Sequence, residues 1–329
     1  MKKVSFLESI SILKNHGIVA FPTETVYGLG AIATSKDAVA KVFSAKNRPA
    51  DNPLICHFSG LNQILEYVEN IPAWTKKLIL ELTPGPISFL LKIPKGSILS
   101  PATAGQDKVA CRIPNHPLTL ELLQKLNIPL VGPSANISGR PSGTSAEMII
   151  NQFKEKIDGV LDGGKSKIGI ESTILDCTKD EEIIILRPGA IGEKELSEVI
   201  TKLNLSIKIV QLNEQLGVIP GSKYKHYSPE TKLVKIQTAN QISSQEKYVV
   251  LATTEIILEY NLKNDLRQKI YIIDLGSKNN LTNVAQNLYS CLFKVDTLNV
   301  NKAFLVEEYF GYSSLAIALK NRLNKIGLE

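Results

Sequence analysis

The chain has 329 residues, 43 % of them hydrophobic, which is enough for about two domains with buried cores. Its net charge of +6 is mild for this length, so it permits an anionic ligand without requiring a nucleic-acid surface. Four scattered cysteines without a CxxC pair, and only four histidines, argue against a disulfide framework or a structural zinc site and predict a cytoplasmic protein. No apolar run approaches the roughly 18 residues that a membrane span needs, so no membrane association is expected.

The first two-thirds of the chain is predicted to alternate strands, helices and loops. Ser5 and Glu8 have the spacing of a capping box, which predicts a helix that begins there and a buried strand after it, over 17–21. Apolar runs between turn residues predict further strands over 87–93, 108–112, 129–131, 159–161, 172–177 and 182–187. Helices are predicted over 73–82, 116–126, 145–154 and 193–203.

Another helix is predicted to begin at Thr34 or Ser35, and it must end before Pro49. Lys46 and Arg48 lie at that end, where arginine offers two parallel donors to a phosphate or carboxylate and lysine offers a mobile charge. Spacing alone favours a simpler explanation, an exposed and frayed helix end whose cations interact with the helix dipole.

Two more cations, Arg112 and Arg187, end predicted strands, and each is closely followed by proline. Four cations at the ends of different elements predict a cleft lined for an anion. A nucleoside triphosphate suits such a cleft, because nucleotidyl transfer needs charge neutralisation and alignment more than a covalent catalyst.

Hydroxyl and amide side chains gather in a loop rich in proline and glycine. Ser134 and Asn136 follow a short strand, Ser142 comes later, and Thr144 has a capping-box spacing with Glu147. A helix N-terminus with nearby hydroxyls can bind an anion, although an ordinary cap is the favoured explanation for Thr144 alone.

A dinucleotide pattern occurs at Gly28–Ala33, which matches G-x-G-x-x-A. In a dinucleotide-binding fold the helix begins directly on the glycines, whereas here the first good helix start is Thr34 or Ser35, so this site is rejected. No P-loop sequence is present. His57 lies on an apolar strand, where a single histidine is more often structural than functional.

The last third is predicted to be a separate α/β unit, because all 16 prolines lie at or before Pro229. Its pattern is strand 232–237, strand 247–252, strand 271–275, helix 280–298, strand 302–307 and helix 313–326. Tyr224, His226 and Tyr227 lie in the segment between the two units and make it too rich in bulky side chains for an inert spacer. We expect this segment to close over the cleft as a lid, or else to join the two units.

These polar segments occur in the same order in the YrdC/Sua5 family, which the whole chain resembles. The matching segments are Phe21–Gly30, Ala45–Pro53, Pro84–Pro86, Val109–Pro114, Pro133–Pro141, Asp162–Thr173 and Arg187–Gly189. The resemblance implies a YrdC-like catalytic domain over 1–205, with a twisted mixed α/β sheet and a deep concave cleft. It also implies a linker over 206–231 and a smaller, Rossmann-like Sua5-type α/β domain over 232–329.

The resemblance also assigns residues. The family's Lys-x-Arg and Ser-x-Asn tetrad falls on Lys46, Arg48, Ser134 and Asn136, with Lys46 and Arg48 as the catalytic pair. ATP contacts are implied at Lys46, Arg48, Asn52, Ser134, Asn136, Ser142, Thr144, Arg187, Tyr224 and His226. L-threonine contacts are implied at Thr23, Thr25, His57, Arg112, Ser172 and Thr173. No protein side chain is expected to bind a metal, because Mg²⁺ arrives with ATP.

Members of this family are threonylcarbamoyl-AMP synthases. The resemblance implies that L-threonine, bicarbonate and ATP give threonylcarbamoyl-adenylate and pyrophosphate. A transferase partner then uses the product to modify the adenosine at position 37 of transfer RNA, and weak RNA binding is compatible with this role.

Two alternatives remain open. A basic concave body can bind double-stranded RNA, but RNA-binding modules usually carry stacking aromatics, and aromatic residues are only 6 % here. A carbamoyl-transfer module shares the YrdC body but normally accompanies zinc-finger and acylphosphatase-like units, and this chain lacks the cysteine clusters of such units.

Overall fold

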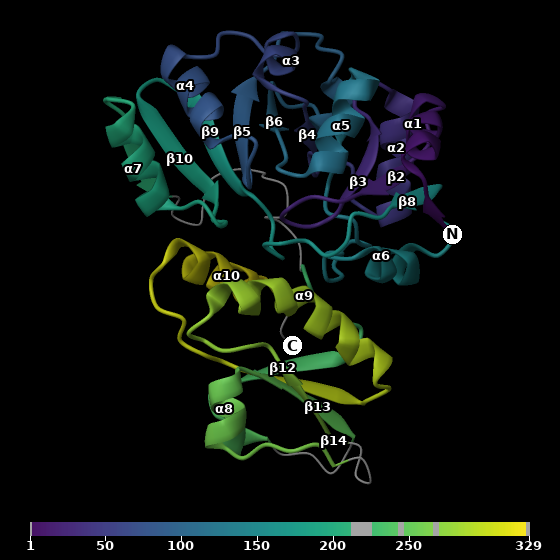
Figure 1. The fold of residues 1–329 in the computed structure, drawn as a ribbon, viewed down its shortest axis with the longest axis vertical. Coiled ribbons are helices and arrows are strands. Elements are labelled where there is room, and N and C mark those ends of the chain that lie inside the picture. Colours follow the sequence, from purple (N-terminus) through teal and green to yellow (C-terminus); the bar gives the residue numbers. More distant parts are fainter. Residues whose placement is uncertain (1, 212–225, 243–246, 266–269, 327–329) are drawn as a thin grey trace.

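A large sheet and a small one organise the protein (Figure 1). The computed structural model describes residues 2–211, 226–242, 247–265 and 270–326. Within these ranges the first sheet has eleven strands in the order β1-β8-β2-β3-β7-β4-β6-β5-β9-β10-β11. The strands are β1 (Lys3–Val4), β2 (Val19–Phe21), β3 (Gly28–Ile32), β4 (Ile55–His57), β5 (Ile87–Lys92), β6 (Lys108–Arg112), β7 (Leu130–Val131), β8 (Gly159–Leu161), β9 (Thr173–Lys179), β10 (Glu182–Arg187) and β11 (Lys208–Gln211). The sheet contains both parallel pairs, such as β4 with β6, and antiparallel pairs, such as β5 with β6, so the expected mixed sheet is confirmed.

Helices cover this sheet, and α1, α2 and α6 begin at serine caps. They are α1 (Phe6–Lys14), α2 (Lys36–Lys46), α3 (Leu61–Leu65), α4 (Ala73–Leu82), α5 (Pro117–Leu126), α6 (Ala146–Phe153) and α7 (Glu193–Lys202). The capping box of Ser5 and Glu8 is confirmed at α1, and the Ser35 hydroxyl accepts a hydrogen bond from the Ala38 amide at the start of α2. Asn47 ends α2 in the left-handed conformation, which turns the chain toward Arg48.

The predicted cap of α6 is wrong by one residue. Ser145, not Thr144, is the N-cap, and its hydroxyl accepts from the Met148 amide. The Thr144 hydroxyl instead contacts the Met148 sulfur at 3.3 Å. Serine is the better N-cap of the two, but both residue types are preferred there, and the capping-box spacing with Glu147 favoured Thr144.

The glycines of the dinucleotide-like pattern belong to a strand. Gly28 and Gly30 lie in β3, antiparallel to β2, so the rejection of a dinucleotide site is confirmed. A Cβ added at either position would come within 2.8 Å of the Phe21 ring. Glycine is therefore required here because an aromatic ring packs against the backbone, not because a phosphate does.

The second sheet is fully parallel and belongs to the tail. Its order is β12-β15-β13-β14 among the described residues, and its elements are β12 (Lys232–Ile236), β13 (Tyr248–Ala252), α8 (Thr254–Glu259), β14 (Ile270–Asp274), α9 (Leu281–Thr297), β15 (Lys302–Val306) and α10 (Ser314–Lys325). One apolar cluster packs α9 and α10 on one face, and another packs α8 on the opposite face. The expected second α/β unit is thus confirmed.

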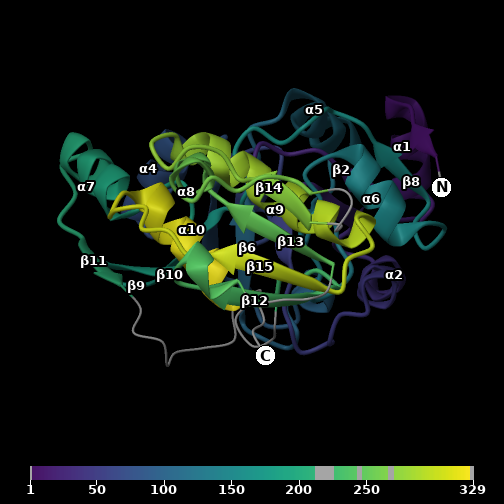
Figure 2. The same ribbon diagram turned by 90° about the horizontal axis from the view of Figure 1, so that it is seen from below.

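The tail contacts the body through α9 and α10, which lie between the tail sheet and the body in Figure 1. Figure 2 shows the tail over the middle of the body. An apolar cluster joins Val26, Met148 and Ile170 of the body to α9 and α10. An ion pair between Arg140 and Asp296, with nitrogen and oxygen 2.5 Å apart, adds a polar contact.

One segment expected in the linker belongs to the body sheet. Residues 208–211 form β11, which pairs in parallel with β10, while Ile207 and Ile209 pack against the body core. The rest of the proposed division at 205 and 231 stays a prediction. No helix in the described ranges is long and apolar enough to cross a lipid bilayer.

Candidate active site

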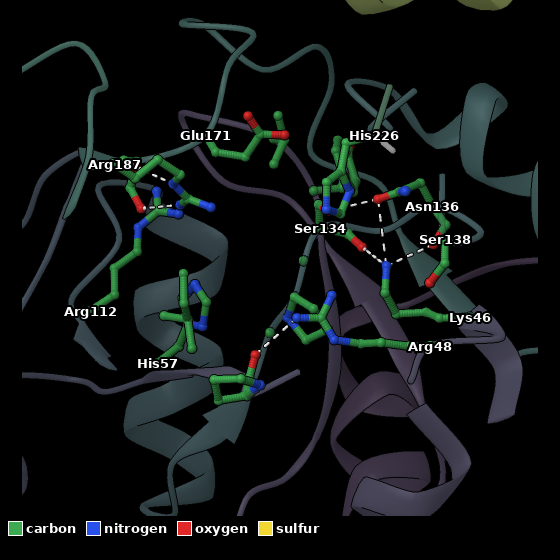
Figure 3. A pocket seen from close by; sticks show the side chains of 18 of the residues that line it. Lys46, Arg48, His57, Arg112, Ser134, Asn136, Ser138, Glu171, Arg187 and His226 are labelled. Carbon is green, nitrogen blue, oxygen red and sulfur yellow. Dashed lines mark hydrogen bonds between the residues drawn. The ribbon is translucent and has the colours of Figure 1, made fainter. Parts of the chain in front are cut away.

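A pocket with about 690 Å³ of space not filled by atoms opens in the body, next to the tail (Figure 3). Nine of the predicted site residues line it: Lys46, Arg48, His57, Arg112, Ser134, Asn136, Ser172, Arg187 and His226. They come from α2, β4, β6, β10 and the loops between elements. In Figure 3, Lys46 and Arg48 lie on one side of the pocket and Arg112 and Arg187 on the other.

Lys46 is buried rather than exposed, so the expected frayed helix end is wrong for this residue. Its exposed fraction is 1 %, and its ammonium donates to the carbonyls of Ser134 and Asn136, the latter at 2.7 Å. Burial, together with the neighbouring Arg48, holds the pKa of Lys46 well below its usual value. The cause of the wrong prediction is the distant loop at 134–138, which covers the end of α2: its Ser138 amide donates to the Lys46 carbonyl at 2.8 Å.

Arg48 is held by the loop that follows it. Its Nε donates to the Asn52 carbonyl at 3.1 Å, and Nη2 donates to the Asn52 side chain at 2.6 Å and to the Pro53 carbonyl at 2.9 Å. Burial and nearby Arg187 lower the pKa of Arg48 to about 10, so it remains charged at neutral pH. Asn52, predicted to contact ATP, does not line the pocket and orients Arg48 instead.

The side chains of Ser134 and Asn136 are hydrogen-bonded to each other beside Lys46. The Ser134 hydroxyl donates to the Asn136 side-chain oxygen at 2.6 Å, and the Asn136 side-chain nitrogen donates to the Ile137 carbonyl at 2.8 Å. An isolated antiparallel β-bridge between Ser134 and Gly28 joins the backbone of this loop to β3. The tetrad predicted from the sequence is therefore brought together in space.

On the other side, Arg187 reaches across to Ser172. Its Nε donates to the Ser172 carbonyl at 3.0 Å and its Nη2 to the Ser172 hydroxyl at 3.2 Å. That hydroxyl also lies 2.9 Å from the Ser88 hydroxyl. Burial and the charge of Arg322 lower the pKa of Arg187 to about 10.

Arg112 and Glu24 form a buried ion pair next to the pocket. Arg112 Nη2 lies 2.9 Å from Glu24 Oε2, although these atoms are not aligned for a hydrogen bond, and 3.4 Å from the Thr23 hydroxyl. Thr23 and Thr25 are buried behind Arg112, with their hydroxyls 2.9 Å apart, and do not line the pocket. Arg112 Nε has no hydrogen-bond partner among the described residues.

His57 is a buried histidine without partners in the described parts of the chain. Its exposed fraction is 1 %, and neither Nδ1 nor Nε2 makes a hydrogen bond to any residue that the structure describes. Burial and nearby Arg112 hold its pKa well below the usual value, so the ring is neutral at pH 7. Unpaired buried polar atoms are costly, and a small polar ligand in this part of the pocket would satisfy them.

The His57 ring packs directly against the backbone of Gly132, where no side chain would fit. A Cβ at Gly132 would lie 2.6 Å from His57 Nδ1 and 2.7 Å from the Phe21 ring. We therefore expect Gly132→Ala to lower the free energy of unfolding by about 1–3 kcal/mol in urea titrations. The control is Gly60→Ala, because its Cβ would meet no atom within 4 Å and the change should stay within about 0.5 kcal/mol. Equal stability of the two variants would contradict the packing described here.

Other predicted residues lie behind the pocket wall. The Ser142 hydroxyl donates to Glu171 at 2.7 Å, and the Thr173 hydroxyl donates to the Ile191 carbonyl at 2.6 Å. Thr144 contacts Met148, as described above. Tyr224 lies outside the described residues. Direct ligand contacts at these positions stay predictions.

The structure adds further pocket residues that were not assigned to a ligand, among them Glu171 and Tyr227. Glu171 precedes Ser172 and faces the pocket, and Tyr227 follows His226. Tyr227 stacks on Tyr289 of α9 with ring centres 5.1 Å apart, and the Ser228 amide donates to the Gly139 carbonyl. The end of the linker therefore contacts both the pocket and the tail, while its closure as a lid stays a prediction.

The pocket as a whole suits a polyanion beside a small polar group. Lys46, Arg48, Arg112 and Arg187 line it together with one carboxylate, Glu171. Buried cations with fixed geometry stabilise developing negative charge without reorganising. No cluster of three or more His, Cys, Asp or Glu side chains able to hold a metal ion occurs within the described residues.

Comparisons with known proteins agree with this geometry. Residues 11–189 match the Sua5/YciO/YrdC family model, described as telomere recombination, and residues 191–326 match the model described as threonylcarbamoyl-AMP synthase, C-terminal domain. A threonylcarbamoyl-AMP synthase of Bacillus subtilis is 36 % identical over 97 % of this chain and 91 % of the relative.

Two solved structures of Sua5 from Pyrococcus abyssi have the same fold. One is a complex with L-threonine, with a TM-score of 0.79 and 30 % identity over 99 % of this chain and 96 % of the other. The second, in which a histidine and the next tyrosine are replaced by alanine, has a TM-score of 0.82 and 30 % identity over 98 % and 92 %. The chain belongs to the Sua5/YciO/YrdC family and carries the Sua5-type C-terminal domain.

Proposed function

We propose that this protein is a threonylcarbamoyl-AMP synthase, which converts L-threonine, bicarbonate and ATP into threonylcarbamoyl-adenylate and pyrophosphate. The observation that carries the proposal is the pocket itself: Lys46 and Arg48 face two further arginines, beside a histidine whose ring nitrogens have no partner among the described residues. The relatives described above bear this enzyme name or bind L-threonine, which supports the same assignment.

The reaction needs alignment and charge neutralisation rather than a protein nucleophile. The threonine amine takes up bicarbonate with loss of water and gives a carbamate. A carbamate oxygen then attacks the α-phosphorus of ATP, and the bond to the pyrophosphate oxygen breaks. Holding the reactants in line can contribute about 7–11 kcal/mol. Cations fixed in a buried pocket stabilise the charge that develops on the phosphates.

The proposed roles follow the two sides of the pocket. Lys46 and Arg48, with Ser134 and Asn136, bind the ATP phosphates, and Arg187 adds a cation from the opposite side. His57, Arg112 and Ser172 contact threonine, with Thr23 and Thr25 behind Arg112. Asn52, Ser142, Thr144 and Thr173 support these side chains or the adjoining loops. His226 lies at the edge of the pocket, where it can contact the nucleotide.

Pyrophosphate release tests the function directly. The protein should release pyrophosphate only when ATP, Mg²⁺, L-threonine and bicarbonate are all present, and mass spectrometry should detect threonylcarbamoyl-adenylate. Reactions lacking one component each are the controls. Turnover without RNA separates this function from double-stranded RNA binding, and the absence of pyrophosphate with all components present would contradict the proposal.

The remaining assignments extend the same proposal. Mg²⁺ is carried by the ATP phosphates, because its preferred ligands are phosphate oxygens and water. The product passes to a tRNA threonylcarbamoyl transferase, and weak RNA binding would aid that transfer. Four free buried cysteines support a reducing compartment such as the cytoplasm.

A further inference from the structure

An arginine of the tail enters the body beside the pocket. Arg322, on α10, has an exposed fraction of 0 %. Its Nε donates to Glu171 Oε2 at 2.9 Å, its Nη2 to the Glu171 carbonyl at 3.2 Å, and its Nη1 to the Pro188 carbonyl. One guanidinium therefore joins the two body segments that flank the β9–β10 hairpin.

These two segments carry pocket residues. Glu171 precedes Ser172, and Pro188 follows Arg187. Arg187 and Ser172 are hydrogen-bonded to each other across the pocket wall. Arg322 lies outside the pocket lining and holds the backbone at Glu171 and Pro188, next to the pocket residues Ser172 and Arg187.

Glu171 itself is a carboxylate that lines a pocket built for anions (Figure 3). Tyr289 of α9 donates to its Oε2 at 2.8 Å, and Ser142 donates to its Oε1 at 2.7 Å. Burial alone would raise the pKa of Glu171, but Arg322 and Arg187 outweigh it and lower the pKa to about 2. The carboxylate is therefore ionised at neutral pH, and its charge would repel a polyphosphate if it were not compensated.

We propose that Arg322 and Tyr289 are positioning residues of the nucleotide site, by which the tail neutralises and holds Glu171 so that the pocket accepts a nucleoside triphosphate. The inference rests on the proposed function and gives the tail a part in it. Neither residue touches the pocket, so both act through Glu171 and through the segments at 171–172 and 187–188.

The test compares four variants with the wild type. Arg322→Gln should raise the KM for ATP on the order of 10- to 100-fold, because a charged hydrogen bond to a buried group is lost. Tyr289→Phe keeps the ring that stacks on Tyr227 and removes one donor, so a rise of roughly 3- to 10-fold is expected. The double variant E171Q/R322Q removes both charges and should bring the KM for ATP back toward the wild-type value. Arg140→Gln is the matched control, because it removes another arginine–carboxylate pair between body and tail without touching Glu171, and its KM should stay unchanged.

A purely structural role for Arg322 predicts a different pattern. Loss of packing would lower the thermal midpoint in Arg322→Gln and would leave E171Q/R322Q no better than the single variant. If Arg322→Gln does not fold, Tyr289→Phe still decides: an unchanged KM for ATP in a folded Tyr289→Phe enzyme overturns the proposal.

Nucleotide binding separates this inference from the proposed function. Calorimetry with Mg²⁺–ATP alone, without threonine or bicarbonate, should show the same order of affinities as the KM values. If the wild type binds Mg²⁺–ATP but forms no threonylcarbamoyl-adenylate, the proposed reaction fails while the inference about Glu171 stands. Equal affinities of the wild type, Arg322→Gln and Tyr289→Phe would refute the inference while leaving the reaction intact.

Discussion

L-threonine is expected to be preferred over L-valine by up to about 10⁴-fold in kcat/KM for pyrophosphate release. The two amino acids have nearly the same shape, and only threonine offers a hydroxyl. In this part of the pocket both ring nitrogens of His57 and Nε of Arg112 are buried without partners in the described chain. Bound valine would leave such groups unpaired, and that cost is what allows a large discrimination.

L-serine is the matched control for this preference. It keeps the hydroxyl and lacks one methyl group, and the loss of such a group is worth only about 10- to 200-fold. The expected order in kcat/KM is therefore threonine, serine, then valine, measured with saturating ATP and bicarbonate. Equal rates with threonine and valine would remove the threonine assignment.

Arg48→Ala is expected to reduce kcat/KM for ATP by about 10³- to 10⁵-fold, the range seen when an arginine that stabilises transferring phosphate is removed. Asn52 and Pro53 hold the Arg48 guanidinium in place, so its charge is already oriented before the nucleotide arrives. Arg48→Lys should also be poor, because lysine cannot reproduce the two parallel donors. Pyrophosphate release with varied ATP measures both variants.

The control for Arg48 lies on the same helix. Lys41 is an exposed cation of α2, away from the pocket lining, and Lys41→Ala should leave kcat/KM within about twofold. Lys46→Ala is a less clean test, because the buried carbonyls of Ser134 and Asn136 would lose their donor at about 1–3 kcal/mol each. Near-normal activity of a folded Arg48→Ala enzyme would contradict its proposed role.

Local patterns predicted most elements of the fold. The strands at 108–112, 159–161 and 182–187 and the helix at 73–82 have the predicted bounds. Short elements were missed, such as α3 and α8, because five or six residues give too little periodicity to separate a helix from a loop.

The candidate site was predictable mainly through the resemblance to the YrdC/Sua5 family. That resemblance singled out the Lys-x-Arg and Ser-x-Asn tetrad, whose four residues line one pocket, whereas the spacing of Lys46 and Arg48 alone favoured an exposed helix end. The burial of Lys46 was not predictable, because it depends on a loop some ninety residues away. Arg322 was missed for the same reason: it looks like a solvent-exposed cation of an amphipathic helix, and only the tertiary fold pairs it with Glu171.

The apolar cluster between body and tail has a consequence for cooperativity. Val26, Met148 and Ile170 complete a core whose other buried side chains come from the tail and from Tyr227. Separating the tail would expose these three side chains at a cost of about 1.5–3 kcal/mol each, and it would open the tail's own core at the same time. The two units therefore stabilise each other, so a mutation that melts the tail should also lower the free energy of unfolding of the body.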